Sequence, residues 1–496
     1  MFSKTSEHCN SEPSVNTNNE KTGLDRKPEL PRKYKILILV LVCMMSFGAN
    51  FSGVSFGYLK SRIISKLNIS NTKYGVLQSS SKLMNTIMPF VAGLYFDASG
   101  SAWGVLAVSI IILLGTSMVA ISSSINSYGM MVAGRLIYGI GSGAIVSIQQ
   151  AILAQCFAGG SVSVAIGIQL STFRLSSFLG TVSVVPFANL TGSITYSFAL
   201  ASGFCALSAL LSLVYCLIVK TEKIAQDLPT IKRKGRFKWK KLLYFPAIFW
   251  LIMLSQTFLG ALWTSFLGFN ADLIKVKFNS SDATAAYIAS VSQIVPILCP
   301  FILGFAMDYF GKRMCFYIGS AILLVISFSL LNYTYIHPLL SMVIFSFSLA
   351  IGPIANITAL SLILPVDYIS TALGLKRSLA SIVTALLDLF SGYIQDRTAG
   401  KNYDRVLLMF IVLSGLTVVI IAFNISYDRM KLGGILDASK KRRLEHMNEM
   451  ENGNTNTMHT GYTQNLKKTK KINIISIVVS LIALVLSWVL FIFLNF

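Results

Sequence analysis

Apolar runs of about 20 residues alternate with short polar segments along most of this chain, the pattern typical of a protein whose helices cross a membrane. The runs predict two groups of six spans. The first group covers 35–57, 74–96, 103–122, 128–150, 162–188 and 195–219, and the second covers 246–269, 283–307, 313–333, 338–363, 373–396 and 405–425. The pattern therefore predicts an all-α polytopic membrane protein.

The polar segments between and around these groups divide the chain into domains. The segment between the two groups carries nine Lys and Arg residues, as a cytosolic linker does. A basic tail is followed by one more apolar run, which predicts a thirteenth C-terminal transmembrane helix. The predicted order is a disordered cytosolic N-terminus (1–34), an N-terminal six-helix half (35–219), the linker (220–241), a C-terminal six-helix half (242–425), a polar basic cytosolic tail (426–471) and the extra helix (472–494).

Composition and charge agree with a membrane protein and indicate its orientation. Hydrophobic residues make up 54% of the chain and charged residues 12%, which is too apolar for a soluble globule of this length. The net charge of +22 is concentrated beside apolar runs, so we interpret it as a topology signal and expect no nucleic-acid partner. The bases place the N-terminus in the cytosol. The exceptions lie in the loop after the first span, at Lys60, Arg62, Lys66 and Lys73.

Glycosylation sequons give an independent test of this orientation. The sequons at Asn68, Asn279 and Asn332 lie in or beside the predicted non-cytosolic loops. We expect any glycan to be attached at these positions.

A glycine and aspartate motif occurs once in each group of spans. The first copy runs from Gly93 through Asp97 to Gly100, and the second runs from Gly304 through Asp308 to Gly311 and ends with Lys312 and Arg313. Glycine permits close approach of two helices, the aspartate can cap the next helix, and the bases hold the turn at an anionic membrane face. The chain here resembles the major facilitator superfamily, whose loops between helices 2 and 3 and between helices 8 and 9 carry this signature. The resemblance implies two six-helix halves with inverted repeats.

Helix 4 carries a second resemblance to the superfamily. Arg135 is followed by Tyr138, Gly139 and Gly141, which fits the Arg-xxx-Gly-x-Gly pattern. We interpret Arg135 as a structural and gating residue, with a role as a substrate ligand as the alternative. Helices 5 and 11 each contain a Gly-xxx-Ser pair, Gly167 to Ser171 and Gly374 to Ser378, and this spacing predicts close helix crossings beside a polar cavity.

Ionisable groups inside the spans are candidate binding residues, because burying an unpaired charge in the bilayer is unfavourable. Arg174 lies on one face of helix 5 with Ser171 and suits bidentate capture of a carboxylate, with an internal ion pair as the alternative. Lys82 shares a face of helix 2 with Gln78 and Asn85, and it either lines the cavity or extends toward the membrane surface.

Asp388 in helix 11 is the acid that lies well inside the second half. It is a candidate to bind a substrate ammonium, to carry a proton, or to pair with Lys82 or Arg174 across the cavity. Its role is therefore left open among these three at this stage.

Sequence signatures of catalysis are absent. The chain has no Walker loop, nucleophile elbow or zinc-ligand spacing, and its four histidines lie outside the spans. The seven cysteines include no CxxC pair. We expect no enzymatic activity, no cofactor and no metal.

Several motifs in order along the spans resemble the lysosomal dipeptide uniporter branch of the superfamily. They include Asn85-xxx-Pro89, Gly134-Arg135 running to Gln149, and the stretch that begins Phe249-Trp250. The resemblance implies that Arg174 holds the peptide carboxylate. The branch's helix 4 glutamate falls at Gly143 here, so Asp388 is the candidate to replace it from across the cavity.

We therefore expect a secondary transporter or facilitator of small organic solutes, with dipeptides or amino-acid-like zwitterions exported from a lysosome or vacuole as the leading hypothesis. The resemblance also implies a glycosylated accessory membrane subunit, and a homodimer is left open. A lysosomal or vacuolar membrane is favoured over the plasma membrane. The alternatives are a proton-linked organic-anion antiporter and a non-transporting sensor or assembly subunit.

Overall fold

The structure is a computed structural model in which regular secondary structure is helical throughout the described part of the chain. Nine of the described helices are long and apolar enough to cross a membrane. The described residues are 32–99, 101–157, 162–220, 247–363, 366–431, 434–437, 482 and 485–493.

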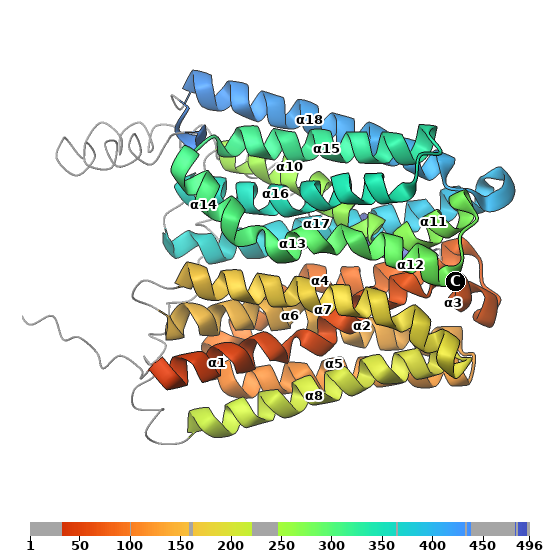
Figure 1. Cartoon of the computed structure of the whole chain (residues 1–496). Helices are drawn as coiled ribbons and strands as arrows, with labels where there is room; N and C mark the ends of the chain where they lie inside the picture. The colour runs from red at the N-terminus through yellow and green to blue at the C-terminus, as the bar shows by residue number, and fades with distance from the viewer. Residues whose placement is uncertain are drawn as a thin grey trace, which may run out of the picture.

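The first group of helices packs side by side in the lower part of Figure 1. Its first span is interrupted at Ser46 and therefore forms two helices that are nearly continuous. The helices are α1 (Arg32–Met45), α2 (Phe47–Tyr58), α3 (Lys60–Leu67), α4 (Asn71–Ser99), α5 (Ser101–Ser124), α6 (Tyr128–Cys156), α7 (Val162–Thr191) and α8 (Ile194–Lys220).

The second group lies above the first in the same view and runs in the same general direction. Its longest helix, α17, packs against α4 of the first group. The helices are α10 (Ala247–Phe266), α11 (Asn270–Phe278), α12 (Asp282–Ser290), α13 (Ile294–Leu298), α14 (Pro300–Phe310), α15 (Arg313–Tyr333), α16 (Pro338–Ile363), α17 (Val366–Arg397) and α18 (Asp404–Lys431), with 3-10 turns η2 (Val291–Gln293), η3 (Ala399–Lys401) and η4 (Ile435–Asp437).

Short helices follow the first and seventh spans where the hydrophobic pattern predicts loops. These are α3 and α11, and both lie at the right-hand end of the bundle in Figure 1, which we call the extension end. Each ends at an asparagine in the left-handed conformation, Asn68 with φ of 50° and Asn279 with φ of 49°. Asparagine tolerates this conformation better than most residues and often terminates helices. The two halves thus repeat the same helix, extension and asparagine cap.

The eighth span, predicted as one helix over 283–307, is divided into α12, η2, α13 and α14. Proline has no backbone N–H and clashes with the preceding turn, and Pro296 and Pro300 lie where the helix is broken. The Oγ of Ser346 accepts a hydrogen bond of 3.1 Å from the backbone N–H of Val295 and so satisfies one of the groups freed by the break.

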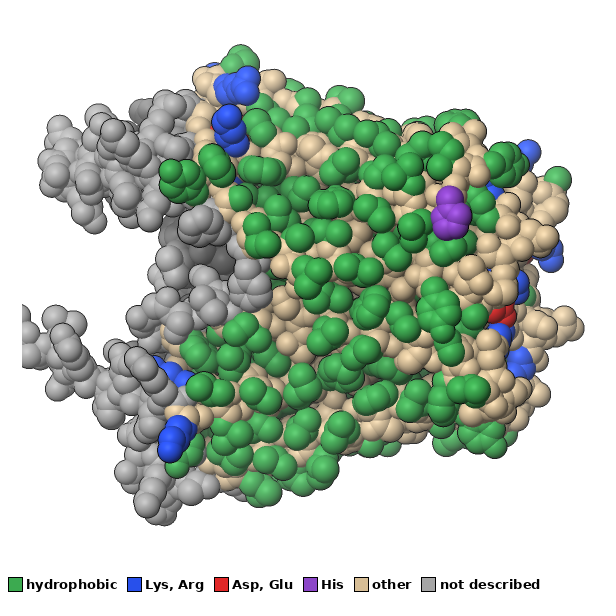
Figure 2. Space-filling view, viewed as in Figure 1, with side chains coloured by type: hydrophobic (Ala, Val, Ile, Leu, Met, Phe, Trp, Pro, Cys, Tyr) green, Lys and Arg blue, Asp and Glu red, His purple; other side chains and the backbone are tan. Residues whose placement is uncertain are grey.

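The surface agrees with a membrane environment. Figure 2 shows hydrophobic side chains over the broad face of the bundle, while Lys and Arg lie toward its two ends. A polar solvent would make so large an apolar face unfavourable, whereas lipid would solvate it.

The predicted boundaries of the C-terminal segments agree with the structure only in part. Helix α18 continues to Lys431, beyond the predicted end at 425. The predicted linker at 220–241 lies almost entirely outside the described residues, as do most of the tail and the start of the thirteenth helix. Residues 485–493 of that last segment are helical, and Phe491 packs into the main hydrophobic cluster.

Candidate functional site

A buried polar cluster joins the two groups of helices at the extension end, and we call it the gate cluster: Lys60, Asp272, Gln395 and Tyr403. Lys60 belongs to α3, whereas its three partners come from α11, α17 and the turn before α18. The lysine is 3% exposed, which is exceptional for a residue type that is almost never buried without a partner. The extension of the first span is what carries its side chain into the second group.

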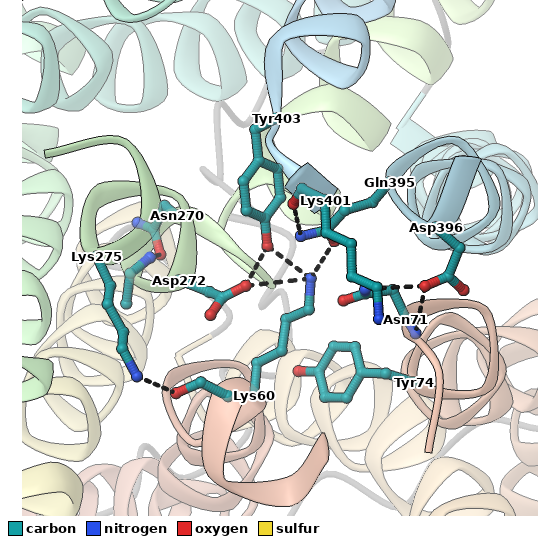
Figure 3. Close-up of polar contacts among 12 residues, drawn as sticks. Lys60, Asn71, Tyr74, Asn270, Asp272, Lys275, Gln395, Asp396, Lys401 and Tyr403 are labelled. Carbon is teal, nitrogen blue, oxygen red and sulfur yellow. Dashed lines mark hydrogen bonds and ion pairs between the residues drawn. The ribbon is translucent and has the colours of Figure 1, made fainter. Parts of the chain in front are cut away.

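The gate cluster is nearly saturated with polar contacts, as Figure 3 shows. Lys60 Nζ donates to Gln395 Oε1 at 2.7 Å and to Tyr403 Oη at 2.6 Å, and it lies 3.4 Å from Asp272 Oδ2. Tyr403 in turn donates its hydroxyl proton to Asp272. Burial lowers the pKa of Lys60, while the carboxylate of Asp272 acts in the opposite direction and favours the ammonium form.

A second contact between the groups lies closer to the surface. Arg62 Nε approaches Asp282 Oδ2 at 2.9 Å, and Lys275 Nζ approaches Asp282 Oδ1 at 2.7 Å. Burial raises the pKa of Asp282, but hydrogen bonds from Lys275 and Arg62 outweigh that effect and hold the pKa below its usual value. We call these three residues the outer clamp.

Asp396 of α17 caps the first turn of α4 from the other half. Its carboxylate accepts hydrogen bonds from the backbone N–H of Asn71 at 3.0 Å and from the backbone N–H of Thr72 at 2.7 Å. A carboxylate at a helix N-terminus satisfies backbone donors and interacts favourably with the helix dipole. This cap therefore stabilises the closed arrangement of the two groups.

Two glycines allow α4 and α17 to touch at the same end. A Cβ at Gly75 would lie 2.6 Å from the carbonyl oxygen of Asp388, and a Cβ at Gly392 would overlap the carbonyl oxygen of Asn71. The extension end is thus closed by backbone contact as well as by charge. The ion pairs explain why Lys60 and Arg62 lie on the predicted non-cytosolic side, where basic residues are not expected. Lys60 pairs with Asp272 and Arg62 pairs with Asp282, and both acids belong to the other half.

In the middle of the bundle, Arg174 lies where α7 meets the broken eighth span. Its Nη1 is 3.4 Å from Gln293 Oε1, and no carboxylate lies within 4 Å of it among the described residues. The break at η2 is what places Gln293 opposite Arg174. The guanidinium also lies over the ring of Phe173, 5.3 Å from its centroid. An arginine whose described contacts are a neutral amide and an aromatic ring retains donors for an anion.

Asp388 lies on α17 beneath the gate cluster and is 5% exposed. Its Oδ1 accepts a hydrogen bond of 2.6 Å from Ser265, whereas Oδ2 has no hydrogen-bond partner among the described residues. No described ion pair within 4 Å joins this carboxylate to Lys82 or to Arg174, so the pairing stays a prediction. A small cavity reaches from Lys60 to Asp388.

The other predicted residues of helices 2 and 4 bind one another. Arg135 donates to Ser81 Oγ at 2.9 Å, to the carbonyl of Leu77 at 3.3 Å and to Gln78 at 3.4 Å. Tyr138 donates to the carbonyl oxygen of Ala49 at 2.7 Å. These contacts tie α6 to α4 and α2.

The helix 4 glycines each mark a close approach. A Cβ at Gly139 would lie 2.8 Å from Ser81, and one at Gly141 would lie 3.0 Å from the carbonyl oxygen of Val108. Gly143 faces Asn85, whose Oδ1 would lie 2.8 Å from an added Cβ. Asn85 also accepts a hydrogen bond of 3.2 Å from Ser142. The space that a longer side chain at 143 would need is therefore occupied by Asn85.

Among the described residues no atom lies within 4 Å of a Cβ built at Gly374, so the close helix crossing that its spacing allows is not found there. The close contacts of α17 occur instead at its other end, at Gly392. Ser171 and Ser378, the serines of the two Gly-xxx-Ser pairs, both have buried hydroxyls without a partner among the described residues.

The two glycine and aspartate motifs are described only in part. The structure does not describe Gly100, nor the side chains of Asp97 and Asp308. The packing around Gly93 and Gly304 is likewise not described. At the second turn, Gly311 has φ of 71°, and Lys312 follows in the left-handed conformation. The backbone carbonyl of Asp437 accepts a hydrogen bond of 3.1 Å from the backbone N–H of Lys312. Its side-chain Oδ1 accepts one of 2.7 Å from the backbone N–H of Met314. Arg313 is 1% exposed.

Sequence reasoning missed the gate cluster, although one signal pointed to it. Lys60 is among the bases that violate the charge rule, and a basic residue on the unexpected side is a reason to search for an acidic partner. Asp272 and Tyr403 carry no comparable signal, because each lies in a short polar segment between spans.

Two bundles of membrane-spanning helices, with polar groups between them and a closed contact at one end, are the arrangement expected of a membrane transporter. A model of the Major Facilitator Superfamily matches residues 37–375. The chain belongs to this superfamily, which indicates a transporter of small solutes rather than an enzyme.

Curated relatives extend the comparison. The chain is 23% identical over 424 residues to the lysosomal dipeptide transporter MFSD1 of Bos taurus, covering 83% of this chain and 89% of the relative. It is 23% identical over 415 residues to the protein of the same name in Danio rerio, covering 81% and 89%. The branch suggested by the sequence motifs is thereby confirmed at the level of family resemblance.

Solved structures share the fold. A point mutant of the nucleoside transporter NupG aligns with a TM-score of 0.63 at 15% identity, covering 78% of this chain and 99% of the other. The xylose transporter XylE from E. coli, in a partially occluded inward open conformation, aligns with a TM-score of 0.62 at 14% identity, covering 79% and 98%. At these identities the likeness concerns the fold alone.

Proposed function

We propose that this protein exports dipeptides or amino-acid-like zwitterions from a lysosome or vacuole by alternating access. Arg174 binds the substrate carboxylate and Asp388 binds the substrate ammonium. The observation that carries the proposal is Arg174, a cation inside the bundle whose described polar contact is the neutral Gln293. The names of the curated relatives support the substrate class and the organelle.

The position of Asp388 supports its role at the other end of the substrate. Arg174 belongs to the first half and Asp388 to the second, so one solute would bridge the two halves. The unpartnered Oδ2 offers an acceptor for an ammonium group. Position 143 carries a glycine that packs against Asn85, so we assign that acceptor to Asp388 of α17 instead.

The proposed orientation places the N-terminus in the cytosol and the extension end in the lumen. In this orientation the gate cluster closes the luminal side, and substrate leaves toward the cytosol. The predicted glycosylation at Asn68, Asn279 and Asn332 would then be luminal. The accessory subunit and the homodimer stay predictions.

The test is uptake into vesicles reconstituted with the full chain, using a dipeptide and the same dipeptide with an amidated carboxyl end. Replacing Arg174 by Lys keeps the charge but loses the planar fork, so transport of the free acid should fall about tenfold, and Ala should lower it further. A hydrogen bond to a charged group contributes roughly 1.5–3 kcal/mol, which is enough for that loss.

The matched control is Arg405→Lys at the exposed start of α18, which should transport as the wild type does. The wild type should transport the amidated peptide poorly. The Arg174 variants should reduce transport of this peptide little further. Equal transport of the free acid by the wild type and Arg174→Ala, at matched abundance in the membrane, would refute the proposal.

A further inference from the structure

Gln293 lies at the contact between the two halves, in the 3-10 turn that divides the eighth span. This turn, η2, packs against α7 of the first half together with α12 and α13. The side chain of Gln293 is 1% exposed, so its amide must find hydrogen-bond partners inside the bundle. A buried polar group without such partners is unfavourable, which makes the contacts of this amide informative.

The amide of Gln293 makes one of the hydrogen bonds available to it within the described structure. Its Oε1 accepts a hydrogen bond from Arg174 Nη1 at 3.4 Å, which is longer than a typical contact of this kind. Its Nε2, a donor group, donates to none of the described residues. Oε1 and Nε2 belong to one planar group, so an unused donor lies beside the atom that faces the arginine.

The guanidinium of Arg174 is also engaged only in part. One of its N–H groups faces Gln293, and its plane lies over the ring of Phe173. The planar fork still has parallel N–H groups to offer a carboxylate. Because Nη1 belongs to this fork and already contacts the amide, a carboxylate on the fork lies within reach of Gln293.

We propose that Gln293 is a substrate-binding residue, which donates a hydrogen bond from Nε2 to the carboxylate that Arg174 holds. The inference rests on the proposed function in that Arg174 binds a carboxylate. The bound carboxylate then accepts hydrogen bonds from both halves, from the guanidinium on α7 and from the amide on η2. Hydrogen bonds to an ionised group are about twice as strong as neutral ones, so the substrate draws the broken span toward α7.

The first experiment measures KM and the maximal rate of Ala-Ala uptake into vesicles reconstituted with the full chain. Gln293→Met keeps the length of the side chain and loses the amide. It should raise KM for Ala-Ala about tenfold with little change in the maximal rate, because a hydrogen bond to a charged group is lost. Uptake of Ala-Ala with an amidated carboxyl end should be unchanged. An equal effect of the variant on both peptides would refute the proposal.

A second variant of nearly the same size is Gln293→Glu. Its carboxylate should pair with Arg174 and repel the carboxylate of the substrate, so uptake of Ala-Ala should fall to background. Uptake like that of the wild type would refute the proposal.

The matched control is Ser292→Ala in the same turn, because the hydroxyl of Ser292 donates to the carbonyl of Ala289 in its own span at 2.7 Å. KM for Ala-Ala should stay as in the wild type. A tenfold rise would assign the effect of the Gln293 variants to the shape of the break and would overturn the proposal.

A binding measurement separates this inference from the dipeptide function. Sodium acetate should raise the melting temperature of the purified wild type more than sodium chloride does at equal concentration. Arg174→Ala should abolish this difference, and Gln293→Met should need about tenfold more acetate to reach it. Absence of peptide uptake with these acetate effects intact would reject dipeptides as the cargo and keep the role of Gln293. Equal acetate responses in the wild type and Gln293→Met would reject that role and keep Arg174 as the anion site.

Discussion

The ammonium of Lys60 lies 3.4 Å from a carboxylate oxygen of Asp272, and this ion pair connects the first half of the bundle to the second. Both side chains are under 10% exposed. Because the pair crosses between the halves, it must break if they are to separate at the extension end. Its strength therefore contributes directly to the balance between closed and open states.

Removing one partner of this pair should open the extension end. Lys60→Met leaves a buried carboxylate without its cation, which destabilises buried pairs by about 3–5 kcal/mol. A cysteine introduced at Ser391, which lines the cavity below the gate cluster, should then react with a membrane-impermeant maleimide at least about tenfold faster than in the otherwise unchanged protein.

The double variant Lys60→Met with Asp272→Asn is the control for this prediction. It removes both charges, so the labelling rate should return part of the way toward that of the protein with the intact pair. A rate unaffected by Lys60→Met would mean that the ion pair does not hold the gate closed.

Gly392→Ala should impair closure without disturbing the fold elsewhere. The added Cβ would overlap the carbonyl oxygen of Asn71, and overpacking of this kind destabilises by about 1–3 kcal/mol. Gly203→Ala is the matched control, since no described atom lies within 4 Å of a Cβ built there and alanine favours a helix by about 1 kcal/mol over glycine. Transport should fall in the first variant only, and a loss in both would contradict the assigned contact.

The outer clamp should survive mild acid. The folded-state pKa of Asp282 is lowered, so its stabilisation is present above the ordinary value of about 3.9 and is lost only as the pH falls through the folded value. Asp282→Asn should therefore lower the melting temperature equally at about pH 7 and pH 5, and the difference should narrow below about pH 4.

Thermal unfolding of the purified protein across this pH range checks the prediction. Arg62→Gln, which removes the opposite partner, should show the same pH profile. If the difference in melting temperature between the wild type and Asp282→Asn already shrinks between pH 7 and 5, the pKa of Asp282 is not lowered.

Asp388→Asn should separate zwitterion transport from proton-linked antiport. If Asp388 binds the ammonium, the variant should transport dipeptide about tenfold less well with or without a pH gradient, because a charge-assisted hydrogen bond is lost. An N-acetylated dipeptide, which lacks the ammonium, should not distinguish the two proteins. Loss of pH-driven uptake with preserved exchange at equal pH would instead favour Asp388 as a proton carrier.

Much of the fold could be predicted from the sequence, because lipid imposes a strong local rule. A segment that crosses the bilayer must be apolar and helical, so hydrophobicity alone locates most spans. The same rule does not apply beyond the membrane, which is why the extensions α3 and α11 were predicted as loops. Nor does a hydrophobic pattern report breaks, and the eighth span was divided by Pro296 and Pro300.

Arg174, Lys82 and Asp388 stand out from the sequence itself, because a charge within an apolar run is conspicuous. Their partners do not. Gln293 faces Arg174 only because the eighth span is broken there, and Ser265 reaches Asp388 only because α10 packs on α17.

The sequence by itself determined the spans, the superfamily motifs and the charges that must be accommodated inside the bundle. The tertiary structure decided which charges meet, as when Lys60 reaches Asp272 and Tyr403 from more than two hundred residues away along the chain. The reason is physical: hydrophobicity is a property of a segment, whereas an ion pair depends on the distance between segments, and that distance is set by the packing of the two halves.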